Sequence, residues 1–292
     1  MTEPSDSKTV WTIRDVLTWT TDYLKRKGCE TPRLDAELLL AHNLGIERIR
    51  LYLDFDRPLS DGERLGFRDL VRRRALREPV ALIIGKKEFW SLDIAVTPGV
   101  LVPRPETEIL VQVVLEDCQG LLNVAILEVG CGSGAPLIAV SSVRPDIQLF
   151  ACDISINSLN CASANASNHG FSAHIFFFAS DLLESVRAEH IFDVIYSNPP
   201  YIPSKDIDSL APEIRDFEPR KALDGGLDGL DVIRRLIPTS RDRLKPGGRL
   251  ILEIGEKQFD SVKKLLEING FSMVRGYKDL SGKNRVVKAV SN

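Results

Sequence analysis

From residue 123 onward, short apolar runs alternate with stretches of helical periodicity, and this alternation limits the fold more than any other feature. Strands that alternate with helices predict a mostly parallel sheet with helices on both faces. We therefore expect an α/β domain with a doubly wound sheet. The apolar runs are Val124–Leu127, Ile147–Ala151, Ala173–Ala179, Phe192–Tyr196, Arg249–Ile254, Phe271–Val274 and Val286–Ala289.

The first 85 residues contain only helical signals. Thr12 can cap a first helix, Pro32 can begin a second, and Ser60-x-x-Glu63 is a capping box for a third that Pro79 ends. The third helix is rich in arginine, and we expect these side chains to form a solvated face; a contact with RNA or an acidic partner is the alternative. They are Arg68, Arg72, Arg73, Arg74 and Arg77.

Two short segments separate the helical part from the α/β part. The apolar pattern of Lys86–Val96 has the period of a β-hairpin, and residues 97–105 are rich in proline and glycine. The sequence thus predicts a smaller N-terminal all-helical domain at residues 1–85, a hairpin linker at 86–97 and the α/β domain at 98–292.

Composition excludes several classes of protein. The net charge is -3, which disfavours an enzyme dedicated to nucleic acid. The five cysteines include no C-x-x-C pair and the four histidines have no metal spacing, so we expect no metal and a reducing, cytoplasmic environment. Residues Met1–Thr9 are polar, unlike a signal peptide, and no apolar run is long enough for a membrane span.

A glycine-rich loop follows the first predicted strand. Gly130, Cys131, Gly132, Ser133 and Gly134 lie between the strand and a helix, where glycines allow a ligand to approach the backbone. An acidic residue that ends the second strand would bind ribose hydroxyls, and Asp153 has this position. The loop also fits a loose dinucleotide pattern, or a simple turn. Gly134, and Glu128 just before the loop, favour a nucleoside without a pyrophosphate.

The fourth predicted strand ends in Asn198-Pro199-Pro200-Tyr201. Two prolines fix the backbone and remove two amide donors, so the Asn198 side-chain oxygen and the Pro199 carbonyl remain as acceptors. Two rigid acceptors suit a planar NH2 group, and the Tyr201 ring can lie against its flat face. Such positioning can lower the barrier to methylation of a weakly nucleophilic nitrogen. A rigid turn without catalytic purpose is the alternative.

With these motifs in hand, the chain resembles the class I methyltransferases, and more closely the protein-(glutamine-N5) methyltransferases of peptide chain release factors. The likeness extends over nearly the whole chain and includes Leu34–His42, Glu88–Leu92, Leu101–Glu108, Leu223–Leu230 and Gly247–Gly255.

The resemblance implies an S-adenosyl-L-methionine-dependent enzyme that methylates the glutamine of a Gly-Gly-Gln sequence in a release factor. It implies cofactor contacts from the glycine loop, Asp153 and Asn198, and an amide site at Asn198–Tyr201. We expect Asp181, after the third strand, to bind the adenine amino group. Leu182 has the position where related sequences often have an aromatic residue against adenine, and we expect it to line the site. The helical domain would recognise the protein substrate.

Three alternatives differ from this function in the substrate or in the absence of catalysis. The first is glutamine methylation of a ribosomal protein. The second is adenine-N6 methylation of DNA or RNA, because the adenine amino group fits the same two acceptors; such an enzyme must flip its base and bind phosphates. The third is a non-enzymatic adaptor, against which the intact Asn-Pro-Pro-Tyr motif argues. We expect no direct binding of nucleic acid and no membrane association.

Overall fold

The structure is a computed structural model and describes residues 10–292, so the polar segment Met1–Thr9 lies outside the described residues. The chain divides into two units. One holds the described residues up to Gly85 together with Pro212–Phe217, and the other holds Lys86–Ala211 and Glu218–Asn292. Segment 212–217 is a difference from the sequence-based division, because it belongs with the helical residues although it follows the fourth strand of the sheet.

The first unit is built from helices packed around an apolar centre. Both predicted helix caps form: the side chains of Thr12 and Ser60 accept hydrogen bonds from the backbone three residues later. Leu17, Leu39 and Leu40 are fully buried in the centre. The sequence did not predict two short helices, α3 and α5, and α4 ends before Pro79. The helices are α1 (Ile13–Arg26), α2 (Pro32–Leu44), α3 (Arg48–Leu53), α4 (Asp61–Ala75) and α5 (Val80–Ile84), with α9 (Pro212–Arg215) in the added segment.

The prediction that the arginines of α4 form a solvated face is wrong for Arg74. Its side chain is 6% exposed, and its Nε donates to Asp35 Oδ2 at 2.7 Å. Its Nη2 donates to Glu213 Oε1 at 2.9 Å, and Arg77 also pairs with Glu213. Helical spacing is the reason: Arg74 lies seven residues after the buried Phe67, on the same face of α4. Arg68 and Arg72 are exposed, as expected.

The second unit contains a seven-stranded sheet with strand order β5-β4-β3-β6-β7-β9-β8. All neighbours are parallel except β7 with β9 and β8 with β9. This confirms the predicted doubly wound, mostly parallel sheet. Its strands are β3 (Ala125–Val129), β4 (Gln148–Asp153), β5 (Ile175–Ala179), β6 (Phe192–Ser197), β7 (Leu244–Glu253), β8 (Phe271–Lys278) and β9 (Asn284–Ser291).

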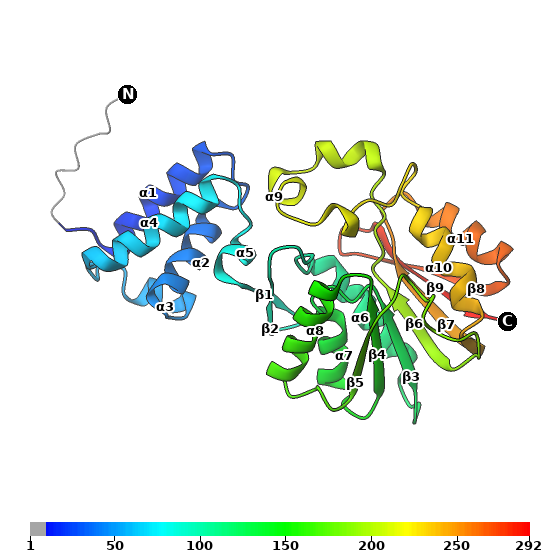
Figure 1. The fold of residues 1–292 in the computed structure, drawn as a ribbon. Helices are drawn as coiled ribbons and strands as arrows, with labels where there is room; N and C mark the ends of the chain where they lie inside the picture. The colour runs from blue at the N-terminus through cyan, green and yellow to red at the C-terminus, as the bar shows by residue number, and fades with distance from the viewer. Residues whose placement is uncertain (1–9) are drawn as a thin grey trace. The chain divides into compact units, whose positions relative to one another are not determined.

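Helices cover both faces of this sheet (Figure 1). Alternate strand residues such as Ile126 and Val194 pack with α6, α7 and α8, whereas Leu127 and Ile195 pack with α10 and α11. The helices are α6 (Glu108–Asp117), α7 (Ala135–Val143), α8 (Ile156–Asn168), α10 (Asp231–Arg241) and α11 (Phe259–Ile268), and three 3₁₀ helices are η1 (Pro105–Thr107), η2 (Ser204–Ser209) and η3 (Arg220–Ala222). Within residues 10–292 no helix could cross a membrane.

The predicted hairpin forms from β1 (Lys86–Phe89) and β2 (Leu92–Ala95), which pair antiparallel. It belongs to the second unit. Asn165 on α8 connects it to the glycine loop, because the Asn165 Nδ2 donates both to the Ala95 carbonyl at 2.9 Å and to the Ser133 carbonyl at 2.8 Å. The hairpin therefore supports the loop that follows β3.

We predict that Arg74→Ala destabilises the protein by about 3–5 kcal/mol, because it leaves Asp35 buried without its charge partner. Urea unfolding followed by circular dichroism measures this loss. Arg72→Ala is the matched control: its side chain is 76% exposed, 3.7 Å from Asp69, and we expect a change within about 0.5 kcal/mol. Equal effects of the two substitutions would contradict the assigned role of Arg74.

Candidate functional site

The carboxyl ends of four parallel strands meet at one edge of the sheet. Val129 at the end of β3 pairs in register with Cys152 of β4 and Ser197 of β6, and Ser197 pairs with Leu252 of β7. The residues that follow these positions are therefore neighbours, although they are far apart in sequence. Ligands of open α/β sheets bind at this edge.

The glycine loop curls over the end of β4. The N–H groups of Gly130 and Cys131 donate to the Cys152 carbonyl, at 2.8 and 3.1 Å. Gly130, Gly132 and Gly134 all have positive φ, which only glycine adopts without strain. A Cβ on Gly130 or Gly132 would meet no atom within 4 Å. A Cβ on Gly134 would lie 2.9 Å from the Ala162 Cβ, so this glycine is required by close packing of the loop on α8.

Asp153 is buried at the end of β4 and hydrogen-bonds the loop directly. Its Oδ2 accepts from the Gly132 N–H at 3.0 Å, and its Oδ1 accepts from the Ser155 N–H at 2.8 Å. Burial raises the pKa of Asp153, and these backbone donors oppose the rise. The backbone of Ile154 and the side chain of Ser158 also bond to this carboxyl group. An ionised carboxylate can accept about four hydrogen bonds, so a hydroxyl of a ligand would share or replace one of these donors.

Glu128 lies in β3, where burial raises the pKa of its carboxyl group well above the usual value. The Tyr196 hydroxyl donates to Glu128 Oε2 at 3.2 Å, and the backbone of Leu137 on α7 also bonds to this carboxyl group. Glu128 thus fixes the start of α7 from inside the protein.

Asp181 and Leu182 follow β5. Asp181 Oδ2 accepts from Arg235 Nη2 on α10 at 2.8 Å and is half-exposed. Leu182 packs against the same cluster as α10 and has a positive φ, and its carbonyl accepts from the Cys152 thiol at 3.3 Å. The structure therefore places Leu182 next to the end of β4, and Asp181 in an ion pair that the sequence did not predict.

Asn198–Tyr201 continues from β6 at the same edge. The Asn198 Nδ2 donates to the Thr107 Oγ1 at 3.2 Å. Because the amide nitrogen is tied to Thr107, the oxygen Oδ1 is the end of the side chain that can accept from a ligand. Tyr201 is half-buried, and its hydroxyl donates to Glu253 Oε1 at 3.2 Å.

Sequence reasoning assigned no role to Thr107 and Glu253. Glu253 is the last residue of β7, next to the end of β6, and is 1% exposed. Burial raises the pKa of Glu253 to about 7; hydrogen bonds with Thr107 and Tyr201 oppose the rise. An acidic residue directly after the apolar Leu250-Ile251-Leu252 was the available signal. Carboxylates are seldom fully buried unless they are paired, and the carboxyl ends of the strands are where open α/β sheets bind ligands.

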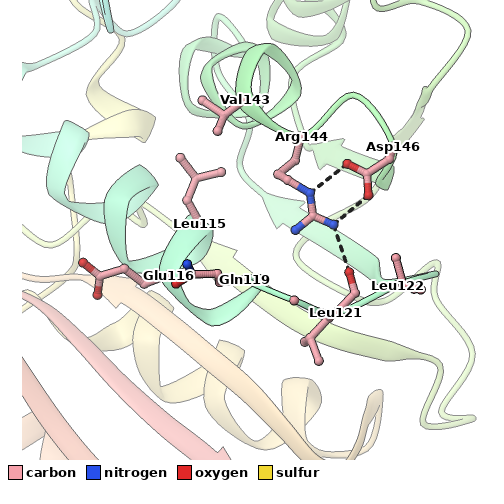
Figure 2. Close-up of a pocket in the computed structure, with 9 residues that line it drawn as sticks. Leu115, Glu116, Gln119, Leu121, Leu122, Val143, Arg144 and Asp146 are labelled. Atoms are coloured by element: carbon pink, nitrogen blue, oxygen red, sulfur yellow. Dashed lines mark hydrogen bonds and ion pairs between the residues drawn. The ribbon is translucent and has the colours of Figure 1, made fainter.

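A pocket of about 610 Å³ lies elsewhere, between the end of α6 and the end of α7 (Figure 2). Its residues precede β3 and β4, so it lies at the amino ends of the strands. Figure 2 shows Arg144 paired with Asp146 and donating to the Leu121 carbonyl. This pocket contains none of the predicted site residues, and we therefore place the candidate site at the carboxyl edge of the sheet. The described residues include no cluster suited to a metal ion.

Two family models match the chain. The model described as PrmC N-terminal domain matches residues 15–85. The model described as methyltransferase small domain matches residues 104–214. The first corresponds to the helices α1–α5, and the second contains the glycine loop and Asn198–Tyr201.

Curated relatives align over almost the entire chain. A release factor glutamine methyltransferase from Rhodopirellula baltica is 43% identical and covers 98% of both chains. One from Geobacter sulfurreducens is 42% identical, over 95% of this chain and 96% of its own. A solved methyltransferase from Pyrococcus furiosus matches with a TM-score of 0.50 and 20% identity, over 69% of this chain and 89% of its own, which supports the fold of the second unit.

We predict that Gly134→Ala destabilises the protein more than Gly130→Ala. Both substitutions place alanine at positive φ, at a cost of about 1 kcal/mol. Only the Cβ at residue 134 would also collide with Ala162, which adds roughly 1–3 kcal/mol. Thermal unfolding of the two variants measures the difference. Equal losses would show that the loop does not pack tightly on α8.

Proposed function

The chain belongs to the release factor glutamine methyltransferase family, and on this premise we propose that it methylates the side-chain amide nitrogen (N5) of the glutamine in the Gly-Gly-Gln sequence of a peptide chain release factor. S-adenosyl-L-methionine is the methyl donor. The observation that carries the proposal is the Asn198 side chain: its nitrogen is tied to Thr107, and its oxygen remains as an acceptor at the edge that holds the glycine loop.

The described residues fit the methyl donor. Gly130 and Gly132 leave open space where side chains would stand, and Asp153 lies beside this space, with its Oδ2 bonded to the Gly132 N–H. Ribose hydroxyls would share or replace the present donors to Asp153. Carboxylates at this edge also suit a cationic sulfonium. We propose that the donor is held by Gly130, Cys131, Gly132, Ser133, Gly134, Asp153, Asp181, Leu182 and Asn198. Asp181 would exchange or share its ion pair with Arg235 to reach the adenine amino group.

Asn198, Pro199, Pro200 and Tyr201 are proposed to hold the substrate amide. The Asn198 Oδ1 and the Pro199 carbonyl accept the two amide N–H hydrogens, which favours charge build-up on nitrogen. Tyr201 holds the plane of the amide, and Pro200 keeps the backbone rigid. S-adenosylmethionine would supply an electrophilic methyl group. The held amide nitrogen would form the new C–N bond as the C–S bond breaks with its electron pair left on sulfur, and the amide would release a proton to solvent.

The proposed partner is a release factor, and the helical unit is proposed to recognise it. Support comes from the separate unit around α1–α5 and from its match to a domain model of its own. The net charge of -3 favours this reading over adenine methylation. A ribosomal-protein glutamine remains the alternative substrate. A cytoplasmic location is proposed because all five cysteines are buried and free.

We predict that Asp153→Ala weakens S-adenosylmethionine binding at least tenfold, because a lost hydrogen bond to a charged group costs roughly 1.5–3 kcal/mol. Isothermal titration calorimetry measures the affinity. Asp181→Ala is the comparison: its carboxylate is already paired with Arg235, so we expect a smaller effect. Unchanged affinity of the Asp153 variant, or tight binding of NAD by the unaltered protein, would refute the proposed nucleoside site.

We predict that Asn198→Ala lowers the methyl-transfer rate by roughly a hundredfold, as when one preorganised hydrogen bond is removed from an active site. Cofactor affinity should fall much less than the rate, because Asn198 is one of nine residues proposed to hold the donor. Labelled methyl transfer to a release factor measures the rate, and Asn269→Ala, at the distant end of α11, is the control. A release factor with glutamate in place of the Gly-Gly-Gln glutamine should stay unmethylated, because a carboxylate has no N–H to donate. Labelling of that variant, or of DNA instead, would refute the proposed substrate.

A further inference from the structure

We propose that Glu253, acting through Thr107, is a positioning residue that fixes which end of the Asn198 side-chain amide faces the substrate, and that it thereby makes the site select an amide over a carboxylate. The inference rests on the proposed function, because it concerns how that substrate is chosen.

The first step is the direction of the hydrogen bonds. An ionised carboxylate can only accept, so the Thr107 hydroxyl must donate its single proton to Glu253. The Thr107 oxygen is then an acceptor for Asn198. The observed contact fits, since the Asn198 Nδ2 is 3.2 Å from Thr107 Oγ1. With its NH2 end committed, Asn198 presents Oδ1 as an acceptor, which matches an amide substrate and repels a carboxylate.

The second step is the unusual state of Glu253. Its Oε2 is buried, and no described residue donates to it with normal hydrogen-bond geometry. The carboxylate is therefore incompletely satisfied, which is costly. Tyr201 donates to Oε1, so the same carboxylate also holds the aromatic residue of the amide site. A residue that served packing alone would be more favourable as an uncharged side chain. The burial of Glu253 thus indicates that this position requires a side chain that can accept hydrogen bonds but cannot donate one.

The third step is pH. Charged or titratable groups around Glu253 come from three elements: Tyr201 after β6, Glu106 on η1, which raises the pKa, and Arg285 on β9, which lowers it. Burial is the largest effect, and the pKa of Glu253 is about 7. Protonated Glu253 can donate to Thr107, which frees the Thr107 proton to point at Asn198. Asn198 can then rotate and present its NH2 group, so productive amide binding is lost as pH falls.

Glu253→Gln mimics the protonated state at every pH and keeps the shape of the side chain. We expect affinity for S-adenosylhomocysteine, which lacks the sulfonium charge, to stay within threefold of the unaltered protein by calorimetry. We expect methylation of a Gly-Gly-Gln release factor to fall about tenfold or more, as for one lost hydrogen bond to a charged group. In the unaltered protein, kcat/KM should fall as pH decreases below about 7. This acid limb should be absent in the variant, because kcat/KM reports ionisation in the free enzyme.

Selectivity is the decisive measurement. Release factors with Gly-Gly-Gln and with Gly-Gly-Glu are bound in the presence of S-adenosylhomocysteine, and the ratio of their Kd values is compared between proteins. We expect Glu253→Gln to reduce the preference for glutamine about tenfold, the same scale as the lost charge-assisted hydrogen bond. General damage to the site would weaken both ligands and leave the ratio unchanged.

Thr107 variants test the connection independently if Glu253→Gln folds poorly. Thr107→Val removes the hydroxyl and should lower the preference for glutamine, and Thr107→Ser should restore most of it. Glu256→Gln is the control, because Glu256 is outside this network and pairs with Lys283. An unchanged Kd ratio in both Glu253→Gln and Thr107→Val, or an acid limb that persists in Glu253→Gln, would overturn the inference. Failure of the unaltered protein to methylate any release factor would instead refute the proposed function.

Discussion

Parallel pairing of β6 with β3 on one side and with β7 on the other is the constraint on which the candidate site depends. Ser197 pairs with Val129 and with Leu252, and the Ser197 hydroxyl donates to the Val129 carbonyl at 2.6 Å. These contacts align the ends of the three strands. Asn198 therefore leaves the sheet between the glycine loop and Glu253. A slip of one residue in this register would turn Glu253 to the opposite face of the sheet and separate it from Tyr201.

The first unit depends on a buried charge network rather than on apolar packing alone. Arg74 contacts Asp35 within the helices and Glu213 from the segment after Asn198–Tyr201. A protein truncated at residue 85 would keep Arg74 and lose Glu213 from its own chain. The helical residues and the connection between β6 and α10 must therefore fold together for this network to be complete. Breaking such a network is costly because the remaining charge is left buried.

Local signals predicted the regular elements well. Alternating apolar runs located the strands of the sheet, and capping residues located the starts of α1 and α4. Long-range polar contacts were less accessible. Arg72 and Arg74 are the same residue type in the same helix. Only the position of Arg74 on the buried face of α4 distinguishes them. The bond between Asn198 and Thr107 joins residues 91 positions apart, and Thr107 follows a segment predicted to be a linker. A single sequence does not show that Thr107 and Asn198 face each other. The glycine loop and Asn198–Tyr201 were therefore predicted, but the residues that support them were not.

Burying the Glu253 carboxylate costs free energy, but a carboxylate can orient the Asn198 amide in a way that a neutral side chain cannot. A neutral glutamine or serine at residue 253 could donate or accept, so two arrangements of Thr107 and Asn198 would have similar energy. Only an ionised carboxylate excludes one of them. Burial opposes ionisation and brings the pKa of Glu253 to about 7. A cation bound at this edge favours the ionised form, and by linkage the ionised form favours the cation. A sulfonium donor and a correctly oriented Asn198 would therefore stabilise each other, so the amide site would be best formed when the methyl donor is present.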